Sequence, residues 1–350
     1  MTLIPRESDA PCLETPLAAL AQPITANEHF FVRNHFATPQ ISRNLWSLRV
    51  EGAVNHPRVW TFDALCNLPS VSRAITMECA GNSRQSLSPK VRGVSWASGA
   101  VGNAQWTGVP LMSLLDLAEV SPNAIEVILE GADSGAVPNL PAPIAFHRSL
   151  PLEKARRPEV LLAYQMNGQD LPTEHGAPLR AIVGGWYGMA SVKWLTRIVV
   201  TDKPFDGHWQ TTDYSYYERA GQAATLRPIQ AMQVKSLIVR PEPGETIPLG
   251  SEYRIEGHAW AGEHAVANVQ VSLDDGASWH LANLSEPSEA FAWARWEFAW
   301  RPTTRGPVRL MPRATDSAGR TQPMERDVDR RTYMVNHVVA TEINVSDRIQ

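Results

Sequence analysis

One segment of the sequence combines residue types and spacing that indicate metal chemistry, ITMECAGNSR at residues 75–84. Cys79 follows an apolar run and enters a turn of small residues, which lets the backbone approach a bulky ligand closely. A thiolate at a strand end is a suitable ligand for a thiophilic metal, and Arg84 can hold an anion beside it. A single cysteine is otherwise more often a small buried hydrophobic residue, and this interpretation is kept for Cys12 and Cys66.

Composition and charge exclude several classes of protein. The 350-residue chain has a net charge of −4 and lacks the basic field that nucleic-acid binding requires. Hydrophobic residues make up 43% of the chain, as in globular proteins, and no run approaches the roughly 20 apolar residues of a membrane helix. Three cysteines without a CxxC pair exclude a disulfide framework, a zinc knuckle and covalently attached haem. The N-terminus shows no secretory signal, which predicts a cytoplasmic protein; a removed signal would instead predict a periplasmic one.

The segments around Cys79 must position it, and they alternate between strand and helix patterns. Residues 1–28 are rich in Pro and Ala and are predicted to form an extended arm. Within 29–230, alternating apolar residues predict strands, a helical pattern covers 109–120, and Asn167–Gly168 predicts a tight hairpin turn. This mixture indicates an α+β domain rather than a regular doubly wound sheet.

Residues 231–350 show a different pattern, with short alternating segments at even spacing and turn signals such as Asp275–Gly276 between them. The pattern is typical of an immunoglobulin-like β-sandwich of about 100 residues. Trp293, Trp296 and Trp300 in this region are predicted to lie either in its core or against the preceding domain.

Several motifs together resemble the sulfite oxidase family of molybdenum enzymes. They are HFFVRNHFATPQI at 29–41, CAGNSR at 79–84, and the long segment from LLAYQMNGQDLP to HWQTTDY, which ends at Tyr214. The motifs occur in the family's order, and the C-terminal segment continues the match. The resemblance implies the sulfite oxidase fold, with a molybdopterin-binding domain followed by an immunoglobulin-like domain that forms a homodimer. It also implies a cofactor of molybdenum and molybdopterin.

The resemblance assigns roles to matching residues. Cys79 is the thiolate bound to molybdenum, and Arg33 and Arg84 bind the substrate. Trp96 belongs to the substrate pocket, and Tyr214 lies beside the metal. Guanidinium groups suit anion binding because they form paired, charged hydrogen bonds. The residues that anchor the pterin and its phosphate are Asn34, His35, His175, Arg180 and Lys193.

The sequence departs from the family pattern at two positions. Ser83 stands where animal and plant members tend to have the first of two consecutive arginines. Arg295 is offset, relative to the neighbouring tryptophans, from the place of a further substrate arginine. Tyr216 and Tyr217 follow Tyr214 closely and are alternatives for the pocket tyrosine.

The expected reaction is oxidation of sulfite to sulfate by oxygen-atom transfer. No haem domain is visible in the sequence, so the electrons are expected to pass to a separate acceptor, a cytochrome or oxygen. One alternative is another oxygen-transfer enzyme of the family, a nitrate or sulfoxide reductase. A second is a non-enzymatic immunoglobulin-like binding protein, against which Cys79 and the basic residues argue. The combination of Arg33, Arg84 and Tyr214 favours a compact oxyanion over a sulfoxide as the substrate.

Overall fold

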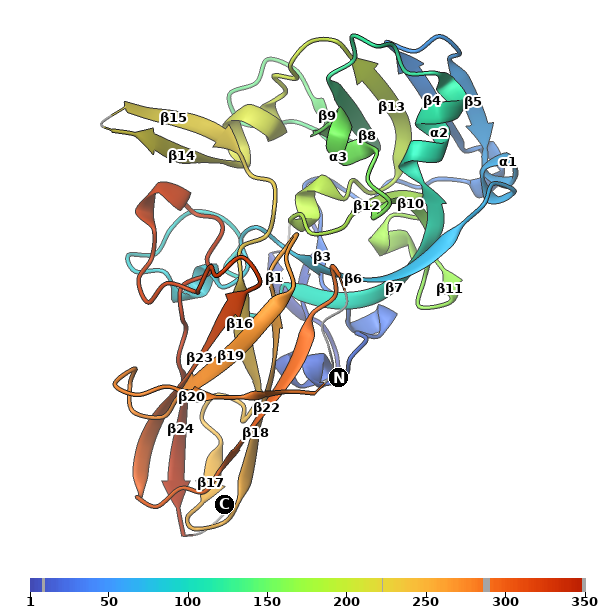
Figure 1. Ribbon diagram of the computed structural model, residues 1–350. Coiled ribbons are helices and arrows are strands. Elements are labelled where there is room, and N and C mark those ends of the chain that lie inside the picture. Colours follow the sequence, from blue (N-terminus) through green and yellow to red (C-terminus); the bar gives the residue numbers. More distant parts are fainter. Residues whose placement is uncertain (8–9, 222, 286–289, 348–350) are drawn as a thin grey trace.

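The predicted N-terminal arm contains two strands of a small sheet. The structure is a computed structural model that describes residues 1–7, 10–221, 223–285 and 290–347 (Figure 1). The buried carboxylate of Glu14 ties the arm to the following domain by accepting the N–H groups of Ala97 (3.1 Å) and Gly99 (2.6 Å). This sheet consists of β1 (Ile4–Glu7) and β2 (Cys12–Glu14) from the arm and of β3 (Val32–Arg33), which follows the arm.

A five-stranded antiparallel sheet carries the chain to Cys79. The second half of β6 is buried, so the chain has entered the core by the time it reaches the cysteine. The predicted Asn-Gly turn is confirmed between β10 and β11, where Asn167 and Gly168 have φ of 54° and 73°, as a tight hairpin requires. The strands are β6 (Val71–Glu78), β7 (Val101–Pro110), β10 (Val160–Met166), β11 (Gln169–Asp170) and β12 (Arg180–Val183).

A second five-stranded sheet lies beside the first, with three short helices around it (Figure 1). The helix predicted over 109–120 is confirmed as α2 (Leu111–Ala118), in which residues at positions i, i+3, i+4 and i+7 are fully buried. The other helices are α1 (Phe62–Cys66) and α3 (Leu152–Ala155). The strands, in spatial order, are β5 (Arg58–Thr61), β4 (Ser47–Gly52), β13 (Leu195–Thr201), β8 (Glu126–Gly135) and β9 (Ile144–Pro151). A hairpin of β14 (Ser215–Ala220) and β15 (Ala223–Pro228) projects from this domain (Figure 1).

The C-terminal region forms two sheets around a separate hydrophobic core that contains Trp296. The chain as a whole is mostly sheet with few helices, consistent with the expected mixed class, and the immunoglobulin-like topology stays a prediction. Among the described residues, no helix is long and apolar enough to cross a membrane. One sheet contains β16 (Lys235–Arg240), β18 (Tyr253–Trp260), β22 (Ala294–Trp300) and β21 (Asn283–Leu284). The other contains β17 (Thr246–Pro248), β24 (Thr341–Ser346), β23 (Gly306–Asp316), β19 (Val266–Ser272) and β20 (His280–Leu281).

The tryptophan-rich segment occupies both predicted locations, the C-terminal core and the contact with the preceding domain. Trp296 is 1% exposed within the C-terminal core, where its indole packs against Gly257, a position at which a Cβ would collide with the ring. Trp293 instead belongs to the core of the first domain. Its backbone N–H donates to Oγ1 of Thr76 (2.7 Å), and its indole N–H donates to the carbonyl of Pro23 (3.0 Å). The two domains are therefore docked through specific bonds.

Acid is expected to destabilise this docking through His258, which is 2% exposed and stacks on Trp293. Its Nε2 donates to the carbonyl of Leu20 (2.6 Å), while Nδ1 has no partner among the described residues. Burial lowers the pKa of His258 from 6.5 to about 4 despite that bond. Because the unfolded chain takes up the proton first, stability falls as pH falls from 6.5 to 4, by up to about 3 kcal/mol.

Urea unfolding at about pH 7 and about pH 4.5 measures this loss of stability. The variant His258→Gln, which does not titrate in this range, is expected to lose less stability over the same interval. Equal losses in the two proteins would contradict the assignment to His258.

Candidate active site

Cys79 leaves the end of β6 and enters a turn that the backbone holds closed. Its N–H donates to the carbonyl of Ala100 (2.9 Å), and its own carbonyl accepts the N–H of Asn82 (2.9 Å). The side chain is 8% exposed. Burial raises the pKa of the Cys79 thiol, whereas Arg84, the N–H of Gly81 and Arg33 act in the opposite direction. Binding of a metal cation would favour the thiolate further.

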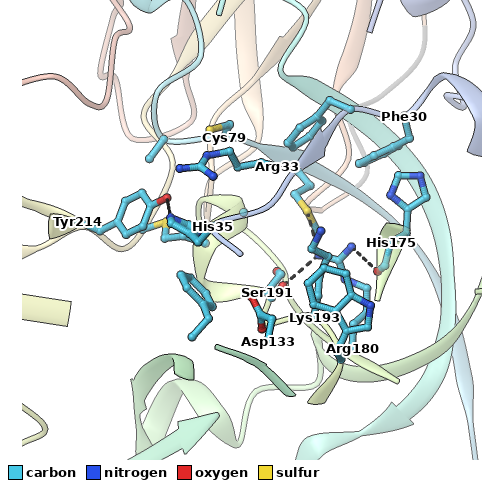
Figure 2. A pocket seen from close by; sticks show the side chains of 17 residues that line it. Phe30, Arg33, His35, Cys79, Asp133, His175, Arg180, Ser191, Lys193 and Tyr214 are labelled. Carbon is cyan, nitrogen blue, oxygen red and sulfur yellow. Dashed lines mark hydrogen bonds between the residues drawn. The ribbon is translucent and has the colours of Figure 1, made fainter. Parts of the chain in front are cut away.

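Cys79 is one of the residues that line a cavity. Figure 2 shows Cys79, Arg33, His35 and Tyr214 toward one end of this cavity, and a second group of basic residues toward the other. Flat apolar walls come from Phe30, Phe31, Phe146 and Trp194.

Tyr214 and His35 form a hydrogen-bonded pair near Arg33. The Tyr214 oxygen lies 2.8 Å from Nε2 of His35. Burial lowers the pKa of His35 well below its ordinary value, and Arg33 acts in the same direction. Burial also raises the pKa of Tyr214, so the phenol keeps its proton beside a neutral ring. Tyr216, under the guanidinium of Arg330, and Tyr217, 40% exposed on the hairpin, are not among the residues that line the cavity.

Arg180, His175 and Lys193 form the other end of the cavity (Figure 2). Arg180 donates to the carbonyls of His175 (2.9 Å) and Ser191 (3.0 Å), and burial lowers its pKa to about 9. Burial likewise lowers the pKa of His175 to about 3, which leaves its ring neutral at physiological pH. Lys193 donates to the carbonyl of Glu174 (2.9 Å) and to the side chain of Asn34, so Asn34 orients the lysine from behind the cavity lining.

The charges of the cavity fit an anionic ligand. Within the described part of the chain, no carboxylate oxygen lies within 4.0 Å of the charged groups of Arg33, Arg180 or Lys193. Asp133 lines the cavity, and burial raises its pKa to about 6; its Oδ1 has no hydrogen-bond partner in the described ranges. Arg180 is buried, and Arg33 and Lys193 are half-buried; a buried cation without a counterion is costly, so a bound anion would stabilise Arg180 most. A flat pterin with N–H groups and a phosphate, and a metal at Cys79, matches this lining.

Arg84 and Trp96 lie behind the cavity rather than in its wall. The guanidinium of Arg84 donates Nε to the carbonyl of Thr332 and Nη1 to that of Val94, both at 2.9 Å. It also lies against Gly81, where a Cβ would collide with it. Trp96 is fully buried, in the same apolar cluster as Cys79. Arg84 thus places positive charge near the sulfur, while two of its donors are used by the protein.

Arg295 does not reach the site. It lies on the exposed side of β22, opposite His258 in the strand register, and lines a different groove. The segment 331–334 of the C-terminal domain contacts residues of the cavity wall, although none of its own residues lines the cavity. There Tyr333 donates to Asp213 (2.8 Å), next to Tyr214, and the N–H of Met334 donates to the carbonyl of Ala80 (2.8 Å).

Sequence reasoning missed Asp133 and Arg148. Asp133 ends a predicted strand, EVILEGAD, and an acidic residue after an apolar run is a weak signal for a site. Arg148 is fully buried on β9, donates to the carbonyls of Trp209 and Ile229 (2.8 Å for the latter), and lies 5.9 Å from the centre of the Tyr214 ring. The two carbonyls flank Tyr214 in the chain, so Arg148 holds the backbone around that tyrosine.

Comparison with known proteins supports the same assignment. Residues 35–209 match the family model described as "Oxidoreductase molybdopterin binding domain", and residues 226–345 match "Mo-co oxidoreductase dimerisation domain". The chain is 36% identical over 334 residues to mitochondrial sulfite oxidase of Drosophila melanogaster, covering 89% of this chain and 57% of that protein. It is 35% identical over 309 residues to NADPH nitrate reductase of Aspergillus niger, covering 80% of this chain and 34% of that protein.

Among solved structures, sulfane dehydrogenase SoxCD from Paracoccus pantotrophus matches with a TM-score of 0.83 and 29% identity, covering 95% of this chain and 85% of that chain. The chain spans a little over half of the length of the Drosophila sulfite oxidase, of which 57% is covered. The two family models together account for most of the chain, and the resemblance drawn from the motifs is confirmed. The chain belongs to the sulfite oxidase family of molybdopterin-dependent oxidoreductases.

Proposed function

We propose that this chain oxidises sulfite to sulfate and passes the electrons to a separate acceptor, a cytochrome or oxygen. The observation that carries the proposal is the meeting of Cys79, Arg33 and Tyr214 at one end of a cavity whose other end is cationic. A small oxyanion fits beside Arg33, because a guanidinium binds it through charged hydrogen bonds.

The reaction adds one oxygen atom to sulfite and removes two electrons. Sulfite and water give sulfate, two protons and two electrons, and the acceptor takes the electrons. The molybdenum–pterin group, held by Cys79 and by the cationic end of the cavity, would supply the oxygen-transfer and electron-accepting chemistry.

The residues of the chain then have distinct tasks. Arg33 binds and orients the anion. One N–H group of its guanidinium donates to the backbone carbonyl of Asn34. Tyr214 holds a proton on its hydroxyl, next to neutral His35, where it can donate to an oxygen of the bound anion. The ring of His35 stacks against Phe146, with 4.6 Å between the ring centres, which fixes its orientation toward Tyr214. Arg180 and Lys193 would hold the phosphate of the pterin.

The alternatives within the family differ in substrate. The matches to a nitrate reductase and to a sulfane dehydrogenase make nitrate and sulfane sulfur the substrates to compare with sulfite, together with sulfoxides. Steady-state assays of cofactor-loaded protein distinguish these substrates. Oxidation of sulfite or of sulfane sulfur is followed with an electron-accepting dye, and reduction of nitrate or of a sulfoxide is followed with a reduced dye. The proposal expects the highest kcat/KM for sulfite, and a higher value for any other compound would overturn it.

Replacing Arg33 by Gln is expected to raise the KM for sulfite about 10- to 100-fold, because one charged hydrogen-bond donor is lost from a buried anion site. The matched change Arg84→Gln is expected to raise it less, since two donors of Arg84 already bind the carbonyls of Thr332 and Val94. Steady-state kinetics with sulfite measure both constants. An unchanged KM in Arg33→Gln would remove this residue from substrate binding.

The proposal includes a homodimer formed through the C-terminal domain. It is supported by the match of residues 226–345 to a family model described as a dimerisation domain.

A further inference from the structure

We propose that the C-terminal domain is part of the cofactor site, because its Lys235 and Trp260 hold the Cys79 turn in place through Glu78 and Asn82. In this proposal Lys235 and Trp260 are positioning residues: they contact neither substrate nor cofactor. The domain then has a second role besides any role in dimerisation.

Glu78, the last residue of β6, is the point of attachment. Its side chain is 2% exposed and that of Lys235 is 4% exposed, with Nζ 2.8 Å from Oε1. The indole N–H of Trp260 donates to the other oxygen, Oε2 (2.9 Å). Two donors from the C-terminal domain therefore fix the residue that immediately precedes Cys79.

Asn82 carries the same restraint to the far side of the turn. Its amide donates to Oε1 of Glu78 (3.1 Å), its Oδ1 accepts the N–H of Ala100 (3.1 Å), and its backbone N–H bonds the carbonyl of Cys79 (2.9 Å). Residues on both sides of Cys79 thus meet at one carboxylate. Within the turn, the carbonyl of Ala80 accepts a further bond from the C-terminal domain, from the N–H of Met334 (2.8 Å).

The arrangement depends on Lys235 because a buried carboxylate needs a charged partner. Without the lysine, the carboxylate of Glu78 would have to move toward water, and this movement would alter its bonds to Trp260 and Asn82. Since Cys79 lies next to Glu78 in the chain, displacement of the carboxylate displaces the backbone that carries the sulfur. A metal ligand held less firmly binds its metal less tightly.

The chain provides a matched control in Lys154. This lysine is also buried at the contact between the domains, where it donates to Glu159 (2.8 Å) and to Glu263 (2.7 Å) of the C-terminal domain. None of these residues takes part in the Cys79 turn. Lys154→Met therefore removes a comparable bond between the domains without touching the proposed restraint.

The first measurement is the rate at which iodoacetamide labels Cys79 in cofactor-free protein, followed by peptide mapping. In Lys235→Met the rate is expected to rise about tenfold or more, the fold-change that loss of one charge-assisted hydrogen bond allows. Lys154→Met is expected to label at the rate of the unaltered protein, and Lys235→Arg, which keeps the charge, is expected to restore slow labelling. Equal labelling in Lys235→Met and the unaltered protein, or equal acceleration in Lys154→Met, would overturn the proposal.

The second measurement is molybdenum and pterin content per chain after expression in cofactor-competent cells, with the sulfur-to-molybdenum absorption as a spectroscopic check. Lys235→Met is expected to retain less cofactor than Lys154→Met at equal thermal stability. If Lys235→Met does not fold, the neutral pair Glu78→Gln with Lys235→Met replaces it. Fast labelling in that pair supports the proposal, and slow labelling overturns it. Neither readout uses sulfite, so failure of the sulfite assay and failure of this inference are separate results.

Discussion

Cys79→Ser is expected to lower kcat/KM for sulfite by more than about 100-fold, because even loss of an outer-shell partner of a metal costs 10- to 100-fold. Serine fills nearly the same volume, so the turn between Ala100 and Asn82 is expected to persist. Its hydroxyl keeps its proton at neutral pH and is a harder donor than a thiolate, which makes it a poor ligand for a thiophilic metal. Turnover, and the sulfur-to-molybdenum absorption of the loaded protein, measure the effect.

Cys66→Ser is the control for the cysteine change. Cys66 lies at the end of α1, half-buried and outside the cavity, and its replacement is expected to leave both readouts unchanged. A Cys79→Ser protein that kept the absorption band and the turnover would show that Cys79 is not the metal ligand.

Arg180→Met is expected to weaken cofactor retention by about 30-fold to 1,000-fold, the range that follows from truncating one member of a buried, hydrogen-bonded charge pair. The physical reason is that this guanidinium is 3% exposed and is bonded to backbone carbonyls rather than to a carboxylate, and burial alone lowers its pKa to about 9. A bound phosphate would compensate the charge that the protein leaves without a carboxylate. Molybdenum and pterin per chain after extensive dialysis measure the retention.

The control for Arg180 is Arg156→Met, which removes an exposed arginine paired with Asp116 at 2.8 Å on the surface. This variant is expected to keep its cofactor, since exposed ion pairs contribute little and Arg156 lies outside the cavity. Full cofactor content in Arg180→Met after dialysis would show that the cationic end of the cavity does not bind the phosphate.

The sequence predicts the strands and the residues of the cavity better than it predicts their contacts. Alternating apolar residues identify β4 and β8, and the helical pattern identifies α2, because those patterns reflect which face of a local element is buried. The motifs point to a set of residues that the structure places around one cavity: Cys79, Arg33, His35, Tyr214, His175, Arg180 and Lys193.

Long-range bonds explain what the sequence could not reveal. Arg84 follows Cys79 closely in the chain, yet its guanidinium binds the carbonyl of Thr332, 248 residues away, instead of facing the cavity. The restraint of Glu78 by Lys235 likewise joins two domains. No local pattern encodes such partners, since spacing specifies which residues share a face of an element but not which distant group meets them. For the same reason a tryptophan-rich strand suggests Arg295 as a substrate residue, although its side chain lines a different groove.

The most direct test of the central claim is anaerobic addition of one equivalent of sulfite to cofactor-loaded protein while the sulfur-to-molybdenum absorption is recorded. If Cys79 binds the metal and the Arg33 end of the cavity takes sulfite, the absorption will bleach promptly and one equivalent of sulfate will appear, with neither change in Cys79→Ser. If the loaded protein does not bleach with sulfite, while nitrate or a sulfoxide reoxidises the chemically reduced protein, the site reduces another oxyanion or a sulfoxide and sulfite is not its substrate.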